Sequence, residues 1–287
     1  KNVTDFLPYT FQILGLLLDA SQGVKSLYTE LFARLLTAEL WRAQANVPGL
    51  VRLFRAYFSK HAVCGDLLRT HMQAIMERFQ FVLSNRKTEA AAFDLLNAMY
   101  SQLPLEFYQP LLKTLLTVLL TRLQSSKSPK FQRDFVISCS LLAHRSPAPL
   151  LPAAFNEIQA GLLANLLTSV WTPVLKMPLR LDERKVCVMA LVKLLSLDEL
   201  RQNVQLVGGL CVGLVNLLSL GASPTASLVE EGSDDEGQPG NGGAGQEFEV
   251  SFNKLRNTDL PGASAGLAPD VPDLHAAAKA SLKPLLG

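Results

Sequence analysis

The stretch FLPYTFQILGLLLD, residues 6–19, shows the pattern on which most of the chain is built. Its apolar residues recur at spacings of three and four, and they are Phe6, Tyr9, Phe11, Ile13, Leu14, Leu17 and Leu18. This spacing is that of an α-helix, and so wide an apolar face is typical of a helix buried on two sides. Pro8 is tolerated in a first helical turn, and Ser21-Gln22-Gly23 can end the segment. We therefore expect a helix over 3–20.

The same unit recurs as pairs of helices. The expected pairs are 3–20 with 24–41, 47–61 with 65–84, 88–102 with 105–125, 130–145 with 149–176, and 180–196 with 198–220. The first helices of these pairs begin 44, 41, 42 and 50 residues apart. HEAT and armadillo repeats have periods of about 40–47 residues. The longest interval contains a long second helix, which we expect to kink before Trp171 because Pro173 follows.

Turn signals and composition agree with this period. Joints are marked by Asn46-Val47-Pro48, Leu103-Pro104, Ser128-Pro129 and Met177-Pro178, each where a helix should stop or start. The chain is 48% hydrophobic but only 7% aromatic, with many Leu and Ala residues, which favour helices over strands. The sequence therefore predicts an all-α protein: a HEAT-type helical-repeat solenoid over 1–220, with about five helix hairpins and a C-terminal extension.

Residues 221–246, GASPTASLVEEGSDDEGQPGNGGAGQ, break the helical pattern. They are rich in Gly, Ser and acids and are predicted to form an acidic flexible loop. Seven acids lie between Glu230 and Glu249, and without them the chain has 18 acids against 27 basic residues. Ser233 is a candidate phosphorylation site because acids flank it. If the loop competes with acidic partners for basic helix faces, deleting Glu230–Gln246 should tighten partner binding at low salt; unchanged affinity would make the loop a spacer.

Residues 247–287 are expected to dock back onto the solenoid. Phe248, Val250, Phe252 and Leu255 supply apolar contacts, and a last helix is predicted from about Pro272 to Leu286. The longest apolar stretch, Leu206 to Leu220, is too short to span a bilayer, so no membrane insertion is expected. The chain begins at Lys1 with neither a signal-peptide pattern nor an initiator Met, which suggests a fragment.

The polar residues form no familiar catalytic, cofactor or metal motif. No GxSxG, HExxH or phosphate-binding glycine loop occurs, and the histidines lie in separate segments without ligand spacing: His61, His71, His144 and His275. The cysteines have no CxxC spacing and are expected to be buried, reduced thiols: Cys64, Cys139, Cys187 and Cys211. Asp94 and Asp134 alternate with apolar positions, as solvated helix faces do. The sequence predicts neither an enzyme nor a nucleic-acid-binding protein.

Basic residues at two helix starts are the candidate partner-binding residues. In RLQSSKSPKFQRDF, residues 122–135, Arg122 can neutralise the C-terminal end of its helix. Lys127, in the joint, can do the same, but Lys130 and Arg133 lie at the start of the next helix, where cations are mildly unfavourable. We predict that Lys127, Lys130 and Arg133 bind an acidic partner. Arg180 and Arg184 form a second such cluster.

Several stretches resemble the C-terminal part of the CAS-type exportins, members of the importin-β (karyopherin) superfamily. They are FLPYTFQILGLLLD, LFARLLTAELWRAQANVPGLVRLFRAYF (residues 31–58), RLQSSKSPKFQRDF, and EVSFNKLRNTD with DLHAAAKASL near the end. The resemblance extends over nearly the whole chain apart from the acidic insert. Asn46-Val47-Pro48 followed by Leu50-Val51-Arg52-Leu53 is its most specific element.

The resemblance implies a nuclear export receptor that binds importin-α together with Ran-GTP, returns it to the cytoplasm and shuttles through the nuclear pore. Such a receptor needs no cofactor and is expected to be monomeric. In such solenoids small rotations between repeats add up, so one receptor can wrap two partners. Second helices usually line the concave face, which suggests 65–84, 105–125 and 149–176 as cargo-facing. The alternative is a structural HEAT or armadillo adaptor that works without a GTPase; an enzyme is a more distant possibility.

Overall fold

The computed structural model describes residues 3–125, 128–219 and 266–286. Every regular element in these ranges is helical, and they contain no strand. The predicted all-α solenoid is therefore confirmed. The first helices of the five hairpins are α1 (Leu7–Ala20), α4 (Val47–Ser59), α6 (Glu89–Gln102), α8 (Pro129–Arg145) and α12 (Leu181–Leu195).

The second helices are more often broken into pieces. The pieces are α2 (Ser26–Leu35) with α3 (Ala38–Arg42), α5 (His61–Ser84), α7 (Leu112–Ser125), α9 (Leu150–Asn156) with α10 (Leu162–Leu166) and α11 (Thr172–Val174), and α13 (Asp198–Arg201) with α14 (Val204–Ser219). Short 3₁₀ turns complete the joints at η1 (Val3–Phe6), η2 (Gln44–Asn46), η3 (Leu105–Phe107) and η4 (Gln109–Leu111).

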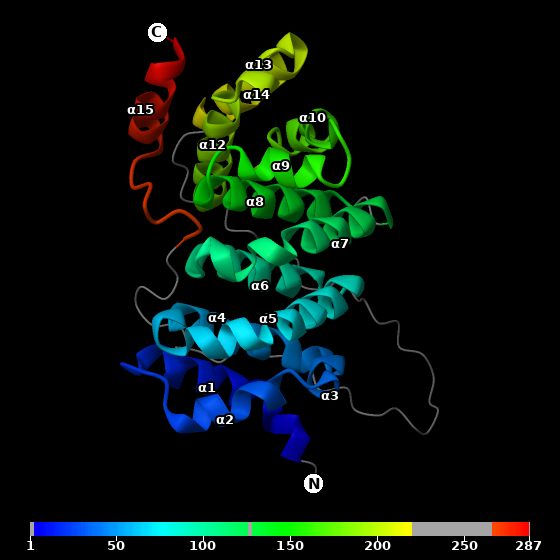
Figure 1. The fold of residues 1–287 in the computed structure, drawn as a ribbon, viewed down its shortest axis with the longest axis vertical. Helices are drawn as coiled ribbons and strands as arrows, with labels where there is room; N and C mark the ends of the chain where they lie inside the picture. Colours follow the sequence, from blue (N-terminus) through cyan, green and yellow to red (C-terminus); the bar gives the residue numbers. More distant parts are fainter. Residues whose placement is uncertain (1–2, 126–127, 220–265, 287) are drawn as a thin grey trace, which may run out of the picture.

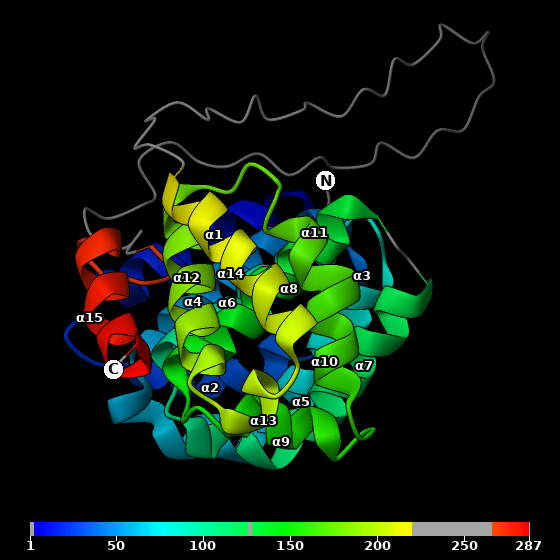
Figure 2. The ribbon, with the colours of Figure 1, turned by 90° about the horizontal axis from the view of Figure 1, so that it is seen from above.

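The two sets of helices form two layers along the long axis of the molecule (Figures 1 and 2). The first helices stack directly on one another, in the order α1, α4, α6, α8 and α12, and pack more closely than the second helices do. Gly49 shows how close this stacking is, because a Cβ atom there would lie 2.8 Å from the Pro8 carbonyl oxygen of α1. The core lies between the layers, with Trp41, Tyr57 and Phe135 among its fully buried side chains.

One predicted helix, 149–176, is wrong as a continuous element. After α9 the chain turns at Gly161, whose φ of 73° is left-handed, a conformation that glycine adopts without steric cost. The run then contains a π-helical turn, η5 (Leu167–Trp171), directly before Thr172-Pro173. A proline removes one backbone donor from the helical ladder, and a π-bulge is a common way to absorb that loss. An irregularity was expected before Trp171, and the structure has this π-helical turn there.

Lysines from neighbouring helices close the ends of two first helices. The Lys60 ammonium donates to the carbonyl oxygens of Asp19 (3.3 Å) and Ser21 (2.7 Å), at the end of α1. The Lys193 ammonium donates to three carbonyl oxygens at the end of α8, those of Ala143, His144 and Ser146, at 2.7–3.1 Å. Helix C-termini carry unsatisfied carbonyls and partial negative charge, so these contacts tie each helix end to the next hairpins.

The chain ends with α15 (Leu274–Leu286), which packs on α12 at the side of the stack (Figure 2). Residues 266–273 lead into it without a helix of their own and run along α8 and α12. The predicted last helix from about Pro272 is thus confirmed to within two residues. Among the described helices, none is both long and apolar enough to cross a membrane.

Candidate functional site

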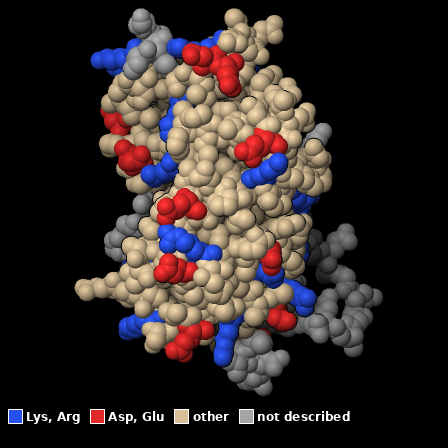
Figure 3. Space-filling view, viewed as in Figure 1, with Lys and Arg blue, Asp and Glu red and all other residues tan. Residues whose placement is uncertain are grey.

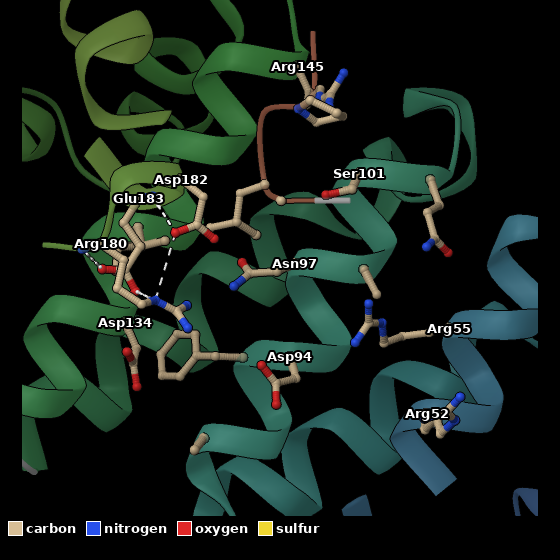
Figure 4. Close-up of a pocket in the computed structure, with 18 of the residues that line it drawn as sticks. Arg52, Arg55, Asp94, Asn97, Ser101, Asp134, Arg145, Arg180, Asp182 and Glu183 are labelled. Atoms are coloured by element: carbon tan, nitrogen blue, oxygen red, sulfur yellow. Dashed lines mark hydrogen bonds and ion pairs between the residues drawn. The ribbon is translucent and has the colours of Figure 1, made fainter. Parts of the chain in front are cut away.

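A groove of about 660 Å³ runs along the layer of first helices. Its walls come from α4, α6, α8, the start of α12 and residues 266–269, and Figure 4 shows the labelled side chains that line it. Its charged residues are Asp19, Arg52, Arg55, Asp94, Lys130, Arg133, Asp134, Arg145, Arg180, Asp182 and Glu183. Positive and negative charges are therefore almost balanced.

This groove lies in the layer opposite to the one that was expected to face a partner. The second helices remain the predicted cargo-facing layer, while the groove of about 660 Å³ lies on the first helices. A smaller hollow of about 540 Å³ does lie in the other layer, between the start of α7 and α9. The face shown in Figure 3 has acidic and basic side chains beside one another, with no large patch of one sign among its described residues. The groove on the first helices is accordingly the leading candidate for a site.

Glu183 is the centre of the ion pairs at one end of the groove. Its carboxylate oxygens lie 2.8 and 2.7 Å from Nη2 of Arg133 on α8. The same carboxylate accepts from the Arg180 backbone N–H at 2.8 Å and from its Nε at 3.0 Å. The Glu183 side chain is only 4% exposed. An acid in the first turn of a helix also complements the helix dipole, so this group both starts α12 and ties it to α8.

A similar pair ties α6 to α7. Nη2 of Arg122 lies 2.9 Å from Glu89 Oε2, and Nε of the same arginine donates to the Leu83 carbonyl at the end of α5. Arg122 thus neutralises a helix C-terminus, as expected, but that of α5 and not of its own helix. Both buried glutamates lie in the first turn of a first helix.

Asp94 and Asp134 are functional candidates that sequence reasoning missed. Neither side chain forms an ion pair or a hydrogen bond with any described residue, although both line the groove. Burial raises the pKa of Asp134 to about 6; Arg133 and Lys130 lower it, while Glu183 and Asp94 raise it further. Burial also raises the pKa of Asp94, against the opposing effect of Arg55, Arg180 and Lys130.

A register signal could have identified this pair. Arg52, Asp94 and Asp134 each lie five residues after the first residue of their helix, α4, α6 and α8. Stacked first helices that begin in register present such positions to the same side of the layer. Reading the acids one helix at a time, as isolated solvated residues, hides this alignment.

The predicted basic residues differ in exposure and in their partners within the structure. Lys130 is exposed and lines the groove, and Arg180 lines it with a half-exposed side chain. Arg133 also lines it, but its cation already has an internal partner in Glu183. Arg184 is only 5% exposed and donates to the Leu217 carbonyl, so it is not available to a partner, and that prediction is corrected. Lys127 and Ser233 lie outside the described residues, as do the acidic loop 221–246 and residues 247–265.

Within the described ranges no three His, Cys, Asp or Glu side chains gather to hold a metal ion. Cys64, Cys139 and Cys187 are buried, and burial raises the pKa of Cys187 to about 12, so this thiol stays protonated. Cys211 is exposed on α14, which corrects the expectation that all four are buried.

Comparisons with known proteins agree in pointing to one family. The family model described as CAS/CSE protein, C-terminus, matches residues 1–285. Exportin-2 of Danio rerio is 30% identical over 198 residues, 68% of this chain and 20% of that protein. Exportin-2 of Homo sapiens is 28% identical over 262 residues, 89% of this chain and 26% of that protein. The chain thus spans about a quarter of the length of these relatives.

A solved structure supports the fold in the same way. The exportin Cse1 in its cargo-free, cytoplasmic state superposes with a TM-score of 0.69. The match covers 97% of this chain and 28% of that one, at 18% sequence identity. At this identity the likeness concerns the arrangement of the helices, and residue roles do not transfer with it.

Proposed function

Because the chain belongs to the CAS/CSE protein family, in its C-terminal part, we propose that it is the C-terminal part of a nuclear export receptor. That receptor would bind importin-α together with Ran-GTP, release both in the cytoplasm and return to the nucleus. The observation that carries the proposal is the family match over residues 1–285. The names of the similar proteins, exportin-2 and the exportin Cse1, support export as the activity of the whole receptor.

The fold supports a role in binding without chemistry of its own. Each hairpin contacts mainly its neighbours, so small rotations between hairpins add up to a change of pitch. A receptor built this way can hold two partners at once and release both when one changes its nucleotide state. The groove on the first helices provides polar side chains for such contacts, Lys130 and Arg180 among them.

Exposed apolar residues on α1 and on the turn η1 before it support a place within a longer solenoid. Phe6 is 67% exposed, Ile13 47% and Leu17 55%, and α1 is the outermost first helix of the stack. Apolar faces of this kind are normally covered in repeat proteins, either by a further repeat or by a polar cap. A preceding hairpin in the full-length receptor would cover them.

The second candidate is a structural HEAT or armadillo adaptor. It would use the same groove but would be indifferent to the nucleotide state of a GTPase. The nearly balanced charge of the groove fits such an adaptor as well as it fits a Ran-binding receptor.

Nucleotide dependence separates the two candidates. The affinity of importin-α for the full-length receptor should be measured by calorimetry in the presence of Ran-GTP and of Ran-GDP. We expect at least tenfold tighter binding with Ran-GTP, since coupling between two ligands is typically worth 5- to 150-fold. Equal affinity with both nucleotides would reject the export receptor and leave the adaptor.

A further inference from the structure

The C-terminal segment Gly266–Leu286 occupies one end of the groove. Gly266, Leu267 and Pro269 are among the groove-lining residues, and a Cβ atom on Gly266 would lie 3.1 Å from the Asp182 Cβ. The segment then crosses from α8 to α12 and continues into α15 (Figure 1). It therefore lies where an extended ligand would enter from that side.

Its apolar anchoring is shallow. Among its described side chains four are buried, and they are small or medium in size: Ala268, Val271, Leu274 and Ala278. Leu267, Ala277 and Leu282 are only partly buried against the core. Stabilisation by apolar burial is roughly proportional to area, and about half of this set contributes only methyl groups. The cost of ordering a segment of this length opposes it. Because this small stabilisation by burial is set against the entropy cost of ordering the segment, we expect the segment to dock reversibly.

Its polar anchoring depends on one aspartate. Asp270 lies 3.0 Å from Nε2 of His144 and 3.2 Å from Nη2 of Arg145, at the end of α8. The Lys185 ammonium of α12 donates to the Pro272 carbonyl at 3.4 Å. Asp270 is 48% exposed, so solvent reaches these contacts. Among the described residues, Arg145 has no other carboxylate partner.

The helix that follows can persist after release. The Asp273 carboxylate accepts from the backbone N–H groups of His275 and Ala276, at 2.9 and 3.0 Å, and so caps the start of α15 from within the segment. Release would leave His144 and Arg145 without the Asp270 carboxylate, and the Lys185 ammonium without the Pro272 carbonyl. A ligand that replaces the segment must supply that negative charge.

We propose that Gly266–Leu286 is a releasable latch over a binding surface on α8 and α12, and that this surface takes an extended acidic segment of a partner protein. In the closed state the latch is the internal occupant, with Asp270 between His144 and Arg145. A partner segment with a carboxylate at the corresponding position displaces it and extends along the groove toward Arg55 on α4.

The test uses the chain of 287 residues with its latch opened or locked. Asp270→Lys places a second positive charge beside Arg145, where burial lowers the pKa of His144 and favours its neutral form, and so opens the latch. Gly266→Cys with Asp182→Cys, in a Cys211→Ser background, places two Cβ atoms 3.1 Å apart, so a small outward shift brings them to the disulfide range of about 3.5–4.5 Å. The reduced form of this variant is its own control. Glu199→Lys is the control for Asp270→Lys. It also replaces an acid by lysine, but at an exposed position on α13 away from the groove.

Hydrogen exchange and a labelled probe give two independent readouts. The probe is a fluorescent peptide of residues 266–280, measured by anisotropy. We expect α15 amides to exchange at least tenfold faster than those of α8 in the unmodified chain, and faster still in Asp270→Lys. The peptide should bind Asp270→Lys at least tenfold more tightly than the oxidised variant, and a peptide with Asp270→Asn should bind at least tenfold more weakly.

Two results would overturn the proposal. Exchange of α15 as slow as that of α8, and unchanged by Asp270→Lys, would make the segment a fixed part of the fold. If the probe bound the opened and oxidised variants equally, or did not bind the opened one, no binding surface would lie beneath the latch. The outcome does not depend on Ran or importin-α, so it stands apart from the test of the export function.

Discussion

Glu183 illustrates how one buried acid holds two repeats together. Its carboxylate pairs with Arg133 of the preceding first helix and with Arg180 at its own helix start. Neutralising it would leave two guanidinium groups beside a buried site without their counter-charge. Breaking a buried pair from one side typically costs about 3–5 kcal/mol, more than an exposed pair contributes.

We predict that Glu183→Gln lowers the free energy of unfolding by about 3 kcal/mol. Urea denaturation, monitored by circular dichroism, measures this change. Glu199→Gln, on an exposed part of α13, serves as the control and should change stability by less than about 0.5 kcal/mol. A loss equally small for Glu183→Gln would mean that Arg133 is free to serve a partner, as first predicted from the sequence.

Asp134 makes stability depend on pH. Its pKa is raised from an ordinary value to about 6, first by burial. The folded protein therefore holds a proton that the unfolded chain has lost between about pH 4 and pH 6, and stability falls as pH rises through this window. Asp134→Asn removes the free-energy cost of ionising this buried carboxyl group.

Asp134→Asn should accordingly stabilise the protein by about 1 kcal/mol at pH 7, a value reduced for partial solvent exposure, and leave it unchanged near pH 4. Thermal unfolding at the two pH values tests this. Asp198→Asn, at an exposed position, should show no difference between them. A variant less stable than the parent at pH 7 would show that the ionised carboxylate has a partner in solution.

At the scale of helices, the closeness of α1 and α4 depends on Gly49. A methyl group there would meet the Pro8 carbonyl at 2.8 Å and the Phe11 Cβ at 3.1 Å. We expect Gly49→Ala to lower the free energy of unfolding by about 2 kcal/mol, since overpacking outweighs the better helix propensity of alanine. Gly208→Ala on α14 has open space around it and should instead stabilise by up to about 1 kcal/mol. If Gly49→Ala and Gly208→Ala shifted the urea midpoint equally, the close packing of α1 on α4 would be contradicted.

The hairpin boundaries were predictable because proline-containing joints and apolar periods agree. The first helix of each pair matches its expected range closely, as with 88–102 and α6 (Glu89–Gln102). The second helix of the fourth pair was not predictable as it stands. Its Leu- and Ala-rich sequence favours a continuous helix, whereas the left-handed turn at Gly161 and the π turn before Pro173 are imposed by local backbone chemistry.

The groove was beyond sequence reasoning for a different physical reason. The basic residues at the α8 and α12 helix starts were recognised as unusual, but the partners that explain them lie 50 and 33 residues away, Glu183 for Arg133 and Leu217 for Arg184. Such pairings depend on how hairpins stack, which a period alone does not specify. The layer that carries the groove depends on the same packing.

At the scale of the whole molecule, we propose that partners bind the layer of first helices. Lys130 lies in the first turn of α8 and Arg55 on α4, both exposed and both lining the groove. An acid at position 130 would complement the helix dipole, so a charge reversal there should not unfold the protein. Lys113 on α7 offers an exposed lysine in the other layer, where the sequence alone placed the partner-facing surface.

The decisive measurement is the affinity of the full-length receptor for importin-α and Ran-GTP, compared between Lys130→Glu with Arg55→Glu and the control Lys113→Glu. We predict that the groove variant binds about tenfold more weakly, with a flatter salt dependence, because it loses attractive charges at the contact. Lys113→Glu should bind as the parent does. Weaker binding by Lys113→Glu, with the groove variant unchanged, would contradict the account and return the site to the second helices.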